Sequence, residues 1–268
     1  MNNLFDASYR CIMADEPTEK VALTKTIARA WKNGELNLNA SDCPIETILK
    51  PGQPANLCLV SPKEVPRRKT LSSEKGQVAL LHALAHIEFN AINLAWDVVY
   101  RFRDLPKAFY DDWVKIADEE ASHFLLLHEQ LEKLAYKYGD LPAHNGLWEM
   151  AVKTADDVLV RMALVPRVLE ARGLDATPPI IAKLQAQQGL QHLAEILEII
   201  LRDEIGHVAT GSRWFIHECE KRGLEPETTF QRLVAQYFTG QIKPPFNRKA
   251  RLAAGFSEAE LETLANSN

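Results

Sequence analysis

Cysteine is scarce in this chain of 268 residues, and its four positions are widely scattered. No two of them have the close spacing that structural zinc sites use, so neither a zinc-thiolate site nor a disulfide framework is expected. We interpret them as reduced, mostly structural thiols of a cytoplasmic protein, where disulfides are rare. They are Cys11, Cys43, Cys58 and Cys219.

Long apolar runs are also missing. No stretch approaches the roughly 18 uninterrupted apolar residues of a membrane-spanning helix. The N-terminal segment MNNLFDASYRCIMADEPTEK lacks the basic start and the apolar run of a secretory signal. We therefore expect a protein that does not enter a membrane.

An excess of positive charge is absent, since the net charge is −5. A chain without an overall basic field is not a general binder of nucleic acid or of acidic membranes. Two short basic segments, 66–69 and 247–251, are interpreted as solvated loops. Nucleic acid, with tRNA as a substrate, is thus only a minor alternative.

Alternation of apolar and polar residues, which marks half-buried strands, is not found, and the expected fold class is all-α. We predict one domain over residues 1–268, with a four-helix bundle at 72–222. N-terminal helices and an extended arm precede it at 1–71, where five prolines between positions 44 and 66 prevent a long helix. A helical extension follows at 223–268. Asp15 is the expected N-cap of a helix with Pro17 in its first turn.

Turn and cap residues place the helices of the bundle. The first two form an αα-hairpin, from Ser72 or Ser73 to about residue 103 and from Pro106 to about residue 136. A third carries Glu170 and stops at Gly173, and Thr177-Pro178-Pro179 starts a further helix. The last long helix follows Gly189 and ends at Gly223, and short helices are expected at 226–238 and 257–264.

The connection at 138–157 leaves two topologies open. An extended return along the bundle is possible, because a strand-like chain spans about 3.3 Å per residue. Alternatively, Asn145 caps one continuous helix to Arg172, which gives a simple up-down-up-down bundle.

Two copies of the pattern Glu-x-x-His carry most of the functional information. They are Glu120–His123 and Glu204–His207, and a lone glutamate precedes each, Glu88 by 32 residues and Glu170 by 34. Spacing of three places both side chains on one helix face. This ligand order is typical of a carboxylate-bridged two-metal site in a helical bundle.

The surroundings of these glutamates strengthen the prediction, because two such matches alone are weak evidence. Glu88, Glu120 and Glu204 each interrupt an apolar helix face, and buried carboxylates need partners. Glu170 fits this pattern less well, since Arg167 lies on the same face of the predicted helix. The alternative is that these groups form ordinary hydrogen-bonded pairs in the core.

The donor set suggests the metal. Carboxylates are hard ligands, imidazole suits iron or manganese, and thiolate is absent. Two divalent cations would balance four carboxylates. Glu119 and Asp203 precede the motif glutamates and are placed to fix the tautomer of a histidine on a neighbouring helix. The alternative is that each is a solvent-facing charge with a partner four residues away on its own helix.

Four segments resemble the ferritin-like family catalogued as domain of unknown function 455: HALAHIEFNAINLAWDVVYRF, EEASHF, ALVPRVLEARGLD and ILRDEIGHV. More distantly, the ligand order is similar to that of di-iron carboxylate oxygenases, including the tRNA-modifying hydroxylase. The resemblance implies a ferritin-like bundle whose metal ligands are Glu88, Glu120, His123, Glu170, Glu204 and His207. It implies no substrate.

Three functions follow as hypotheses. The first is an oxidoreductase that uses two metal ions, iron or iron with manganese, to activate dioxygen or peroxide. It would act on an unknown small molecule with an unknown reductant, in a cavity lined by Trp96, Phe124 and Trp214. The second is a metal-binding or iron-handling protein without an organic substrate, and the third is a structural protein with a degenerate site.

Overall fold

The computed structural model describes residues 2–39, 44–66 and 70–266. These residues form helices and no strand, apart from two isolated β-bridges, so the all-α prediction is confirmed for them. The chain divides into two compact units, Met1–Val152 and Lys153–Asn268, and each is described by itself. Cys43 and residues 67–69 of the first basic segment lie outside the described residues. The single domain predicted over residues 1–268 stays a prediction.

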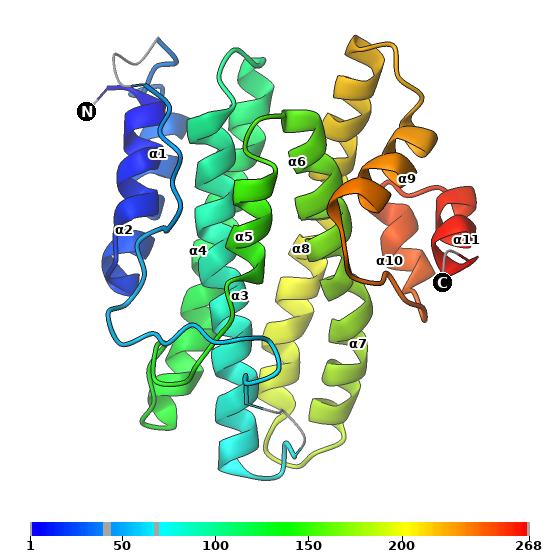
Figure 1. Ribbon diagram of the computed structural model, residues 1–268. Helices are drawn as coiled ribbons and strands as arrows, with labels where there is room; N and C mark the ends of the chain where they lie inside the picture. The colour runs from blue at the N-terminus through cyan, green and yellow to red at the C-terminus, as the bar shows by residue number, and fades with distance from the viewer. Residues whose placement is uncertain (1, 40–43, 67–69, 267–268) are drawn as a thin grey trace. The chain divides into compact units, whose positions relative to one another are not determined.

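The first unit is built on an antiparallel helix pair. Helices α3 (Glu74–Arg101) and α4 (Lys107–Lys133) follow each other after a short turn and pack along their length (Figure 1). The predicted αα-hairpin is therefore confirmed. Ser73 caps α3 as expected, because its hydroxyl accepts a hydrogen bond from the backbone N–H of Gly76 at 3.2 Å.

Helices α1 (Leu4–Met13) and α2 (Pro17–Lys32) pack on this pair, α1 against α3 and α2 against α4. The buried ammonium of Lys20 donates to the carbonyls of Cys11 and Ile12 and to Asn93 Oδ1, at 2.7–2.8 Å. It adds a donor to two carbonyls in the last turn of α1 and ties both helices to α3. The prediction for Asp15 is wrong, because Glu16 occupies the N-cap position without a side-chain hydrogen bond. Proline begins α2, where its missing N–H is tolerated.

The proline-rich segment contains no helix in its described part, 44–66, as expected. It packs on the first unit. The Tyr100 hydroxyl accepts from the backbone N–H of Glu46 at 2.8 Å, and the Trp148 indole donates to the carbonyl of Ile48 at 3.1 Å. The segment is thus an ordered arm rather than a linker.

Neither topology foreseen for residues 138–157 is found in its simple form. A turn leads to the short helix α5 (Gly146–Lys153), and a new helix starts at Val158. One continuous helix from Asn145 to Arg172 is therefore wrong. The break occurs because the Asp157 side chain caps the next helix by accepting from the Leu159 N–H at 2.8 Å.

The second unit contains a long helical segment packed against α8 (Gln191–Lys221). The segment runs through α6 (Val158–Leu164), the π-helical turn η1 (Val165–Glu170) and α7 (Ala171–Gln185). The expected stop at Gly173 and the separate helix start at Thr177 are both wrong. Gly173 lies inside α7, and so do Pro178 and Pro179.

The helix continues through Pro178 because another segment replaces the lost hydrogen bond. Proline has no N–H, so the carbonyl of Leu174 lacks its partner four residues on. The Asn247 side chain donates to that carbonyl at 3.2 Å. A residue distant in sequence thus supports α7 at a position where local rules predict a helix start.

Short helices complete the second unit. They are α9 (Pro226–Tyr237), α10 (Arg248–Ala253) and α11 (Glu258–Asn266), of which α9 and α11 match the predicted extension closely. The break at Gly189 and the end of α8 before Gly223 are also confirmed, and both glycines have positive φ angles.

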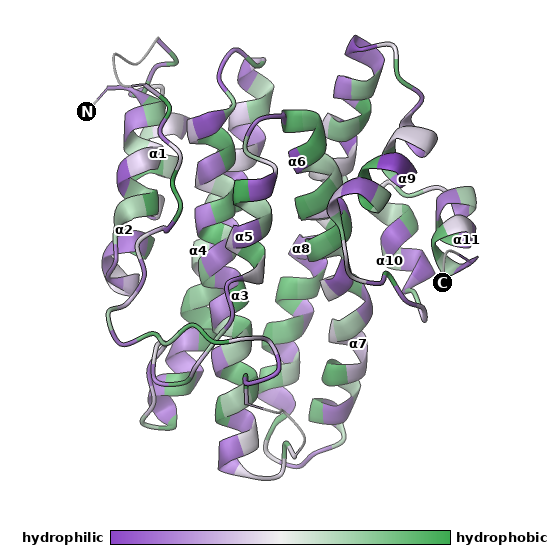
Figure 2. Cartoon of the chain, in the orientation of Figure 1, coloured by the Kyte–Doolittle hydropathy of each residue, from purple (hydrophilic) through white to green (hydrophobic). Residues whose placement is uncertain are grey.

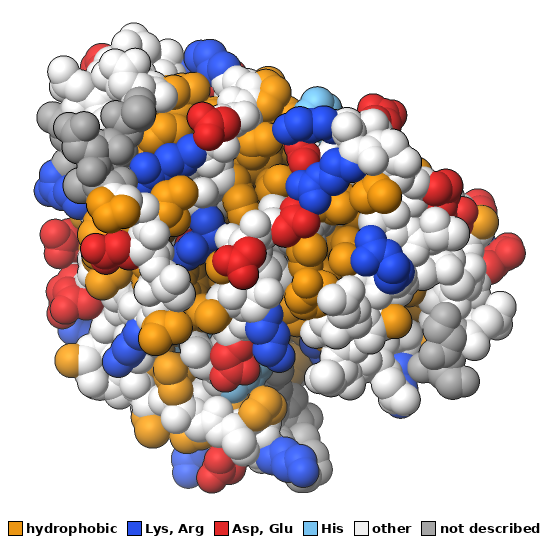
Figure 3. Space-filling model, turned by 45° about the horizontal axis from the view of Figure 1, so that its top comes forward, with side chains coloured by type: hydrophobic (Ala, Val, Ile, Leu, Met, Phe, Trp, Pro, Cys, Tyr) orange, Lys and Arg blue, Asp and Glu red, His pale blue; other side chains and the backbone are white. Residues whose placement is uncertain are grey.

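Apolar and polar residues share the same helices, as Figure 2 shows by hydropathy. One helix of the described chain, Glu74–Arg101, is long and apolar enough by composition to cross a membrane, and 83% of its most apolar window is buried within the protein. On the face drawn in Figure 3, acidic and basic side chains are interspersed.

Candidate metal centre

Three of the predicted ligands come together inside the first unit. Glu88 lies near the middle of α3, and Glu120 and His123 lie one turn apart on α4. The hairpin packs these two helix faces against each other, so ligands that are 32 residues apart in sequence become neighbours. Their exposed fractions are only 3%, 1% and 1%. We call these three residues the first half-site.

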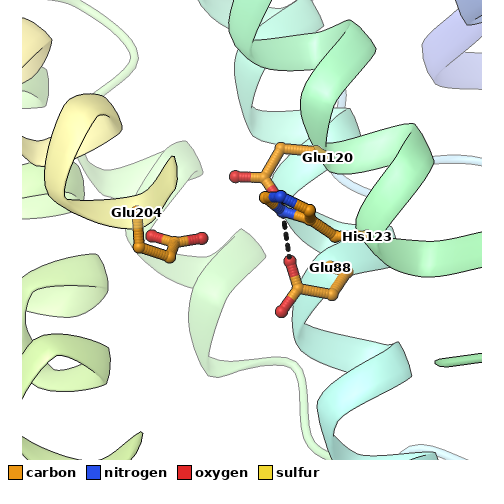
Figure 4. A group of neighbouring side chains, drawn as sticks. All are labelled: Glu88, Glu120, His123 and Glu204. Atoms are coloured by element: carbon orange, nitrogen blue, oxygen red, sulfur yellow. Dashed lines mark hydrogen bonds and ion pairs between the residues drawn. The ribbon is translucent and has the colours of Figure 1, made fainter. Parts of the chain in front are cut away.

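The two carboxylates gather around one imidazole nitrogen. His123 Nδ1 lies 3.3 Å from Glu120 Oε2 and 3.5 Å from Glu88 Oε2. One ligand atom from each of the three residues lies within 4.8 Å of the others. Figure 4 shows the three side chains pointing toward one another. It also draws Glu204 of α8, which is described below with the second unit.

Charge in the first half-site is held away from water. Burial, together with the negative charge of Glu120, raises the pKa of Glu88 well above its ordinary value. For His123, burial alone would lower the pKa, but the two carboxylates outweigh it and raise the pKa. The three groups thus share protons, and a cation can take the place of those protons.

One atom of the half-site is incompletely satisfied. Glu88 Oε2 is buried and makes no well-oriented hydrogen bond among the described residues, and its contact with His123 is long. Buried carboxylate oxygens normally have partners, since an unsatisfied one is costly. The missing interaction is of the kind that a metal ion supplies.

The second unit contains the other three predicted ligands. Glu204 and His207 lie one turn apart on α8, with His207 Nδ1 3.7 Å from Glu204 Oε1. His207 is buried, and Glu204 is half-buried. Glu170, also half-buried, is the last residue of the π-helical turn η1. We call Glu170, Glu204 and His207 the second half-site, and their role as ligands stays a prediction.

Two other acids from the sequence analysis have surface partners. Glu119 Oε1 lies 2.9 Å from Lys115 Nζ, one turn earlier on α4. Asp203 Oδ1 lies 3.0 Å from the guanidinium of Arg202. The Lys115–Glu119 pair has the four-residue spacing of the alternative that we considered. The role of Glu119 and Asp203 in orienting a histidine stays a prediction.

The aromatic residues expected around a cavity can be placed within their own units. Trp96 is fully buried, and its indole donates to Thr24 of α2 at 3.0 Å, so it belongs to the helix core there. Phe124 packs on Phe89 and stacks on His128. Trp214 lies on α8 of the second unit. The cavity itself stays a prediction.

A histidine-tyrosine cluster beside the first half-site was missed by the sequence analysis. His86 Nδ1 lies 2.9 Å from the Tyr138 hydroxyl, and the Tyr138 ring packs on Phe89, next to Glu88. His82 Nε2 accepts from the backbone N–H of Gly139 at 3.0 Å. The signal was present, since His82 and His86 are four apart in an otherwise apolar stretch.

Comparison with known proteins now identifies the family. Residues 13–262 match the sequence profile described as "Protein of unknown function (DUF455)". The chain belongs to the DUF455 family. The matched residues include all six predicted ligands. The match confirms the resemblance seen in the sequence at the level of the family.

One curated relative is similar over most of this DUF455 protein. It is an "Uncharacterized protein" from Haemophilus influenzae, 50% identical over 218 residues, which are 79% of this chain and 75% of the relative. No solved structure matches the chain. The family description therefore leaves the activity to be argued from the site.

Proposed function

We propose that this DUF455 protein is a ferritin-like dinuclear metal protein, with iron, or iron with manganese, as the metal and the residues of the two half-sites as ligands. The observation that carries the proposal is the first half-site, where two buried carboxylates converge on one imidazole nitrogen. The second half-site repeats the same Glu-x-x-His pattern with a preceding glutamate. A repeated ligand set of this kind is typical of di-iron carboxylate bundles.

The residues of the first half-site fit a divalent cation. Two carboxylates carry two negative charges, which one such cation neutralises, and the imidazole adds a neutral ligand. Glu88 Oε2 lacks a good hydrogen bond, and burial makes its uncompensated charge unfavourable. The donor set contains no thiolate, which disfavours a structural zinc site.

The proposed activity is that of an oxidoreductase, which activates dioxygen or peroxide and oxidises a small molecule. When bound, reduced iron or manganese supplies the electrons for such chemistry. The chain's own contribution is to hold the ions in a buried site and to exclude water through the side chains of α3 and α4. Protons that leave Glu88 and His123 when a cation binds are taken up by solvent or by neighbouring bases.

Anaerobic loading with ferrous iron tests this proposal. We expect about two iron ions for each chain, and a new visible absorption band after exposure to oxygen. Replacement of a ligand, Glu120→Gln, should reduce the bound iron, whereas Glu129→Gln on the exposed side of α4 serves as the matched control.

The outcomes separate the hypotheses. Two irons with an oxygen-dependent spectrum support the oxidoreductase. Uptake of many irons for each chain would instead favour iron handling without an organic substrate. Absence of bound metal, or equal binding by the Glu120→Gln and Glu129→Gln variants, would overturn the proposed site.

A further inference from the structure

The C-terminal segment packs on the part of the second unit that carries Glu170. This segment, residues 247–266, begins at Asn247, the N-cap of α10, and runs through α10 to the end of α11. It contains none of the predicted ligands. Its contacts nevertheless converge on η1 and the start of α7, on both sides of Glu170.

The first of these contacts is a buried ion pair. Arg167 lies on η1, three residues before Glu170, and its Nη2 donates to Glu260 Oε1 of α11 at 2.6 Å. The side chains of Arg167 and Glu260 are only 1% and 8% exposed. A buried ion pair of this kind is stable only in good geometry. Removal of one partner leaves an uncompensated charge in the protein interior.

Three aromatic rings enclose the same guanidinium. The centre of the Arg167 guanidinium lies 4.4–4.8 Å from the ring centroids of Phe215, Phe230 and Phe256. Such distances correspond to cation–π contacts, which are strongest where water is excluded. Glu260 and the rings together restrict where the Arg167 side chain can lie.

The residues just after Glu170 are held as well. Arg251 of α10 donates to both carboxylate oxygens of Asp175, at 2.7–3.1 Å, and to the carbonyl of Ala171 at 3.3 Å. Asn247 binds the carbonyl of Leu174 and, through its backbone N–H, Asp175. The C-terminal segment therefore fixes the chain immediately before and after Glu170.

The local helix geometry explains why this matters for Glu170. A π-helical turn contains one residue more than an α-helical turn. The side chains near its end therefore point in other directions than they would on an uninterrupted α-helix. The turn approaches α8 closely: Gly211 of α8 lies against the side chain of Pro166, with no room for a Cβ. Gly211 lies one turn beyond His207 on α8.

We propose that Arg167 and Glu260 are positioning residues, which hold the π-helical turn and thereby aim the Glu170 carboxylate as a metal ligand. The inference rests on the proposed function, since it needs Glu170 to bind metal. The C-terminal segment thereby has a role in the metal centre, although this segment contributes no ligand. Pairing distant residues around a ligand in this way is a common means of orienting it.

Titration with cobalt(II), followed by its visible absorption, tests this role in the full-length chain. We expect Glu260→Gln to weaken one of two cobalt sites about tenfold, as loss of an orienting partner does. Glu258→Gln is the matched control, because Glu258 lies on the same helix and forms an exposed pair with Arg248. Glu260→Asp carries the same test if the glutamine variant does not fold.

A double-mutant cycle separates positioning from general support of the fold. In a Glu170→Ala background, Glu260→Gln should weaken cobalt binding no further, because the residue through which it acts is gone. Additive losses, or a Glu260→Gln variant that binds cobalt like Glu258→Gln, would overturn the inference and leave the proposed function intact. A wild-type chain without tight cobalt binding would overturn both.

Discussion

The Asn247 side chain donates a hydrogen bond to the backbone carbonyl of Leu174 at 3.2 Å, in place of the N–H that Pro178 lacks. The same Asn247 side chain caps α10, since its Oδ1 accepts from the backbone N–H of Ala250 at 3.2 Å. Two structural needs, a helix cap and a proline gap in another helix, are thus met by one residue.

This relationship yields a stability prediction. Asn247→Ser keeps a good N-cap but loses the amide donor, so we expect a loss of about 1–2 kcal/mol in the free energy of unfolding. In a Pro178→Ala background the new N–H can serve Leu174, and the same replacement should then cost much less. Urea unfolding of the four chains measures this. Equal losses in both backgrounds would show that the Asn247 amide does not compensate for the hydrogen bond that Pro178 cannot donate.

Removal of metal should destabilise the chain. Without a cation the carboxylates within each half-site repel one another, and binding to the folded state alone adds about 2.7 kcal/mol at a hundredfold excess over the dissociation constant. For a chain of this size, we expect chelation to lower the melting temperature by about 5–10 °C. Calorimetry of loaded and chelated protein checks this, and identical melting curves would count against an occupied site.

Metal affinity should rise with pH. The two carboxylates raise the pKa of His123 against the effect of burial, and burial raises the pKa of Glu88, so the metal-free site holds protons at neutral pH. A cation must displace them, and the apparent affinity should increase about tenfold per pH unit for each proton released. Calorimetric titration in buffers of different ionisation enthalpy counts the protons. An affinity independent of pH would contradict the shared-proton description.

Acid should destabilise the first unit through His82. Burial, aided by the positive charge of a protonated His86, lowers the pKa of His82 from 6.5 to about 4. The stability that depends on neutral His82 is therefore fully present above pH 6.5. It is lost as the pH falls toward 4, because in that range the unfolded chain binds the proton and the folded chain does not. The full shift corresponds to a few kcal/mol, at about 1.4 kcal/mol per pH unit.

His82→Gln tests this assignment, because glutamine can accept from Gly139 but does not titrate. With chelator present throughout, stability of the variant should fall less steeply between pH 6.5 and 4 than that of the wild type. His86, whose pKa burial likewise lowers to about 4, should leave a residual slope. Parallel pH profiles would mean that His82 is not the titrating group.

Local sequence determined the features that depend on one or two helical turns. Ser73 caps α3, Gly189 and Gly223 bound α8, and the spacing of Glu120 and His123 places both on one face of α4. Each of these follows from backbone geometry and from hydrogen bonds within a few residues, which a sequence displays directly. The same reasoning failed at Gly173 and Pro178, where the outcome depends on a distant partner.

Tertiary structure decided which buried polar groups meet. Glu88 reaches His123 only because α3 packs on α4, and Lys20 is satisfied only by carbonyls of α1 and by Asn93. The π-helical turn before Glu170 and the Arg167–Glu260 pair leave no mark in the helical period of the sequence. The physical reason is that a buried charge or an open carbonyl must be satisfied, while the residue that satisfies it can come from anywhere in the chain.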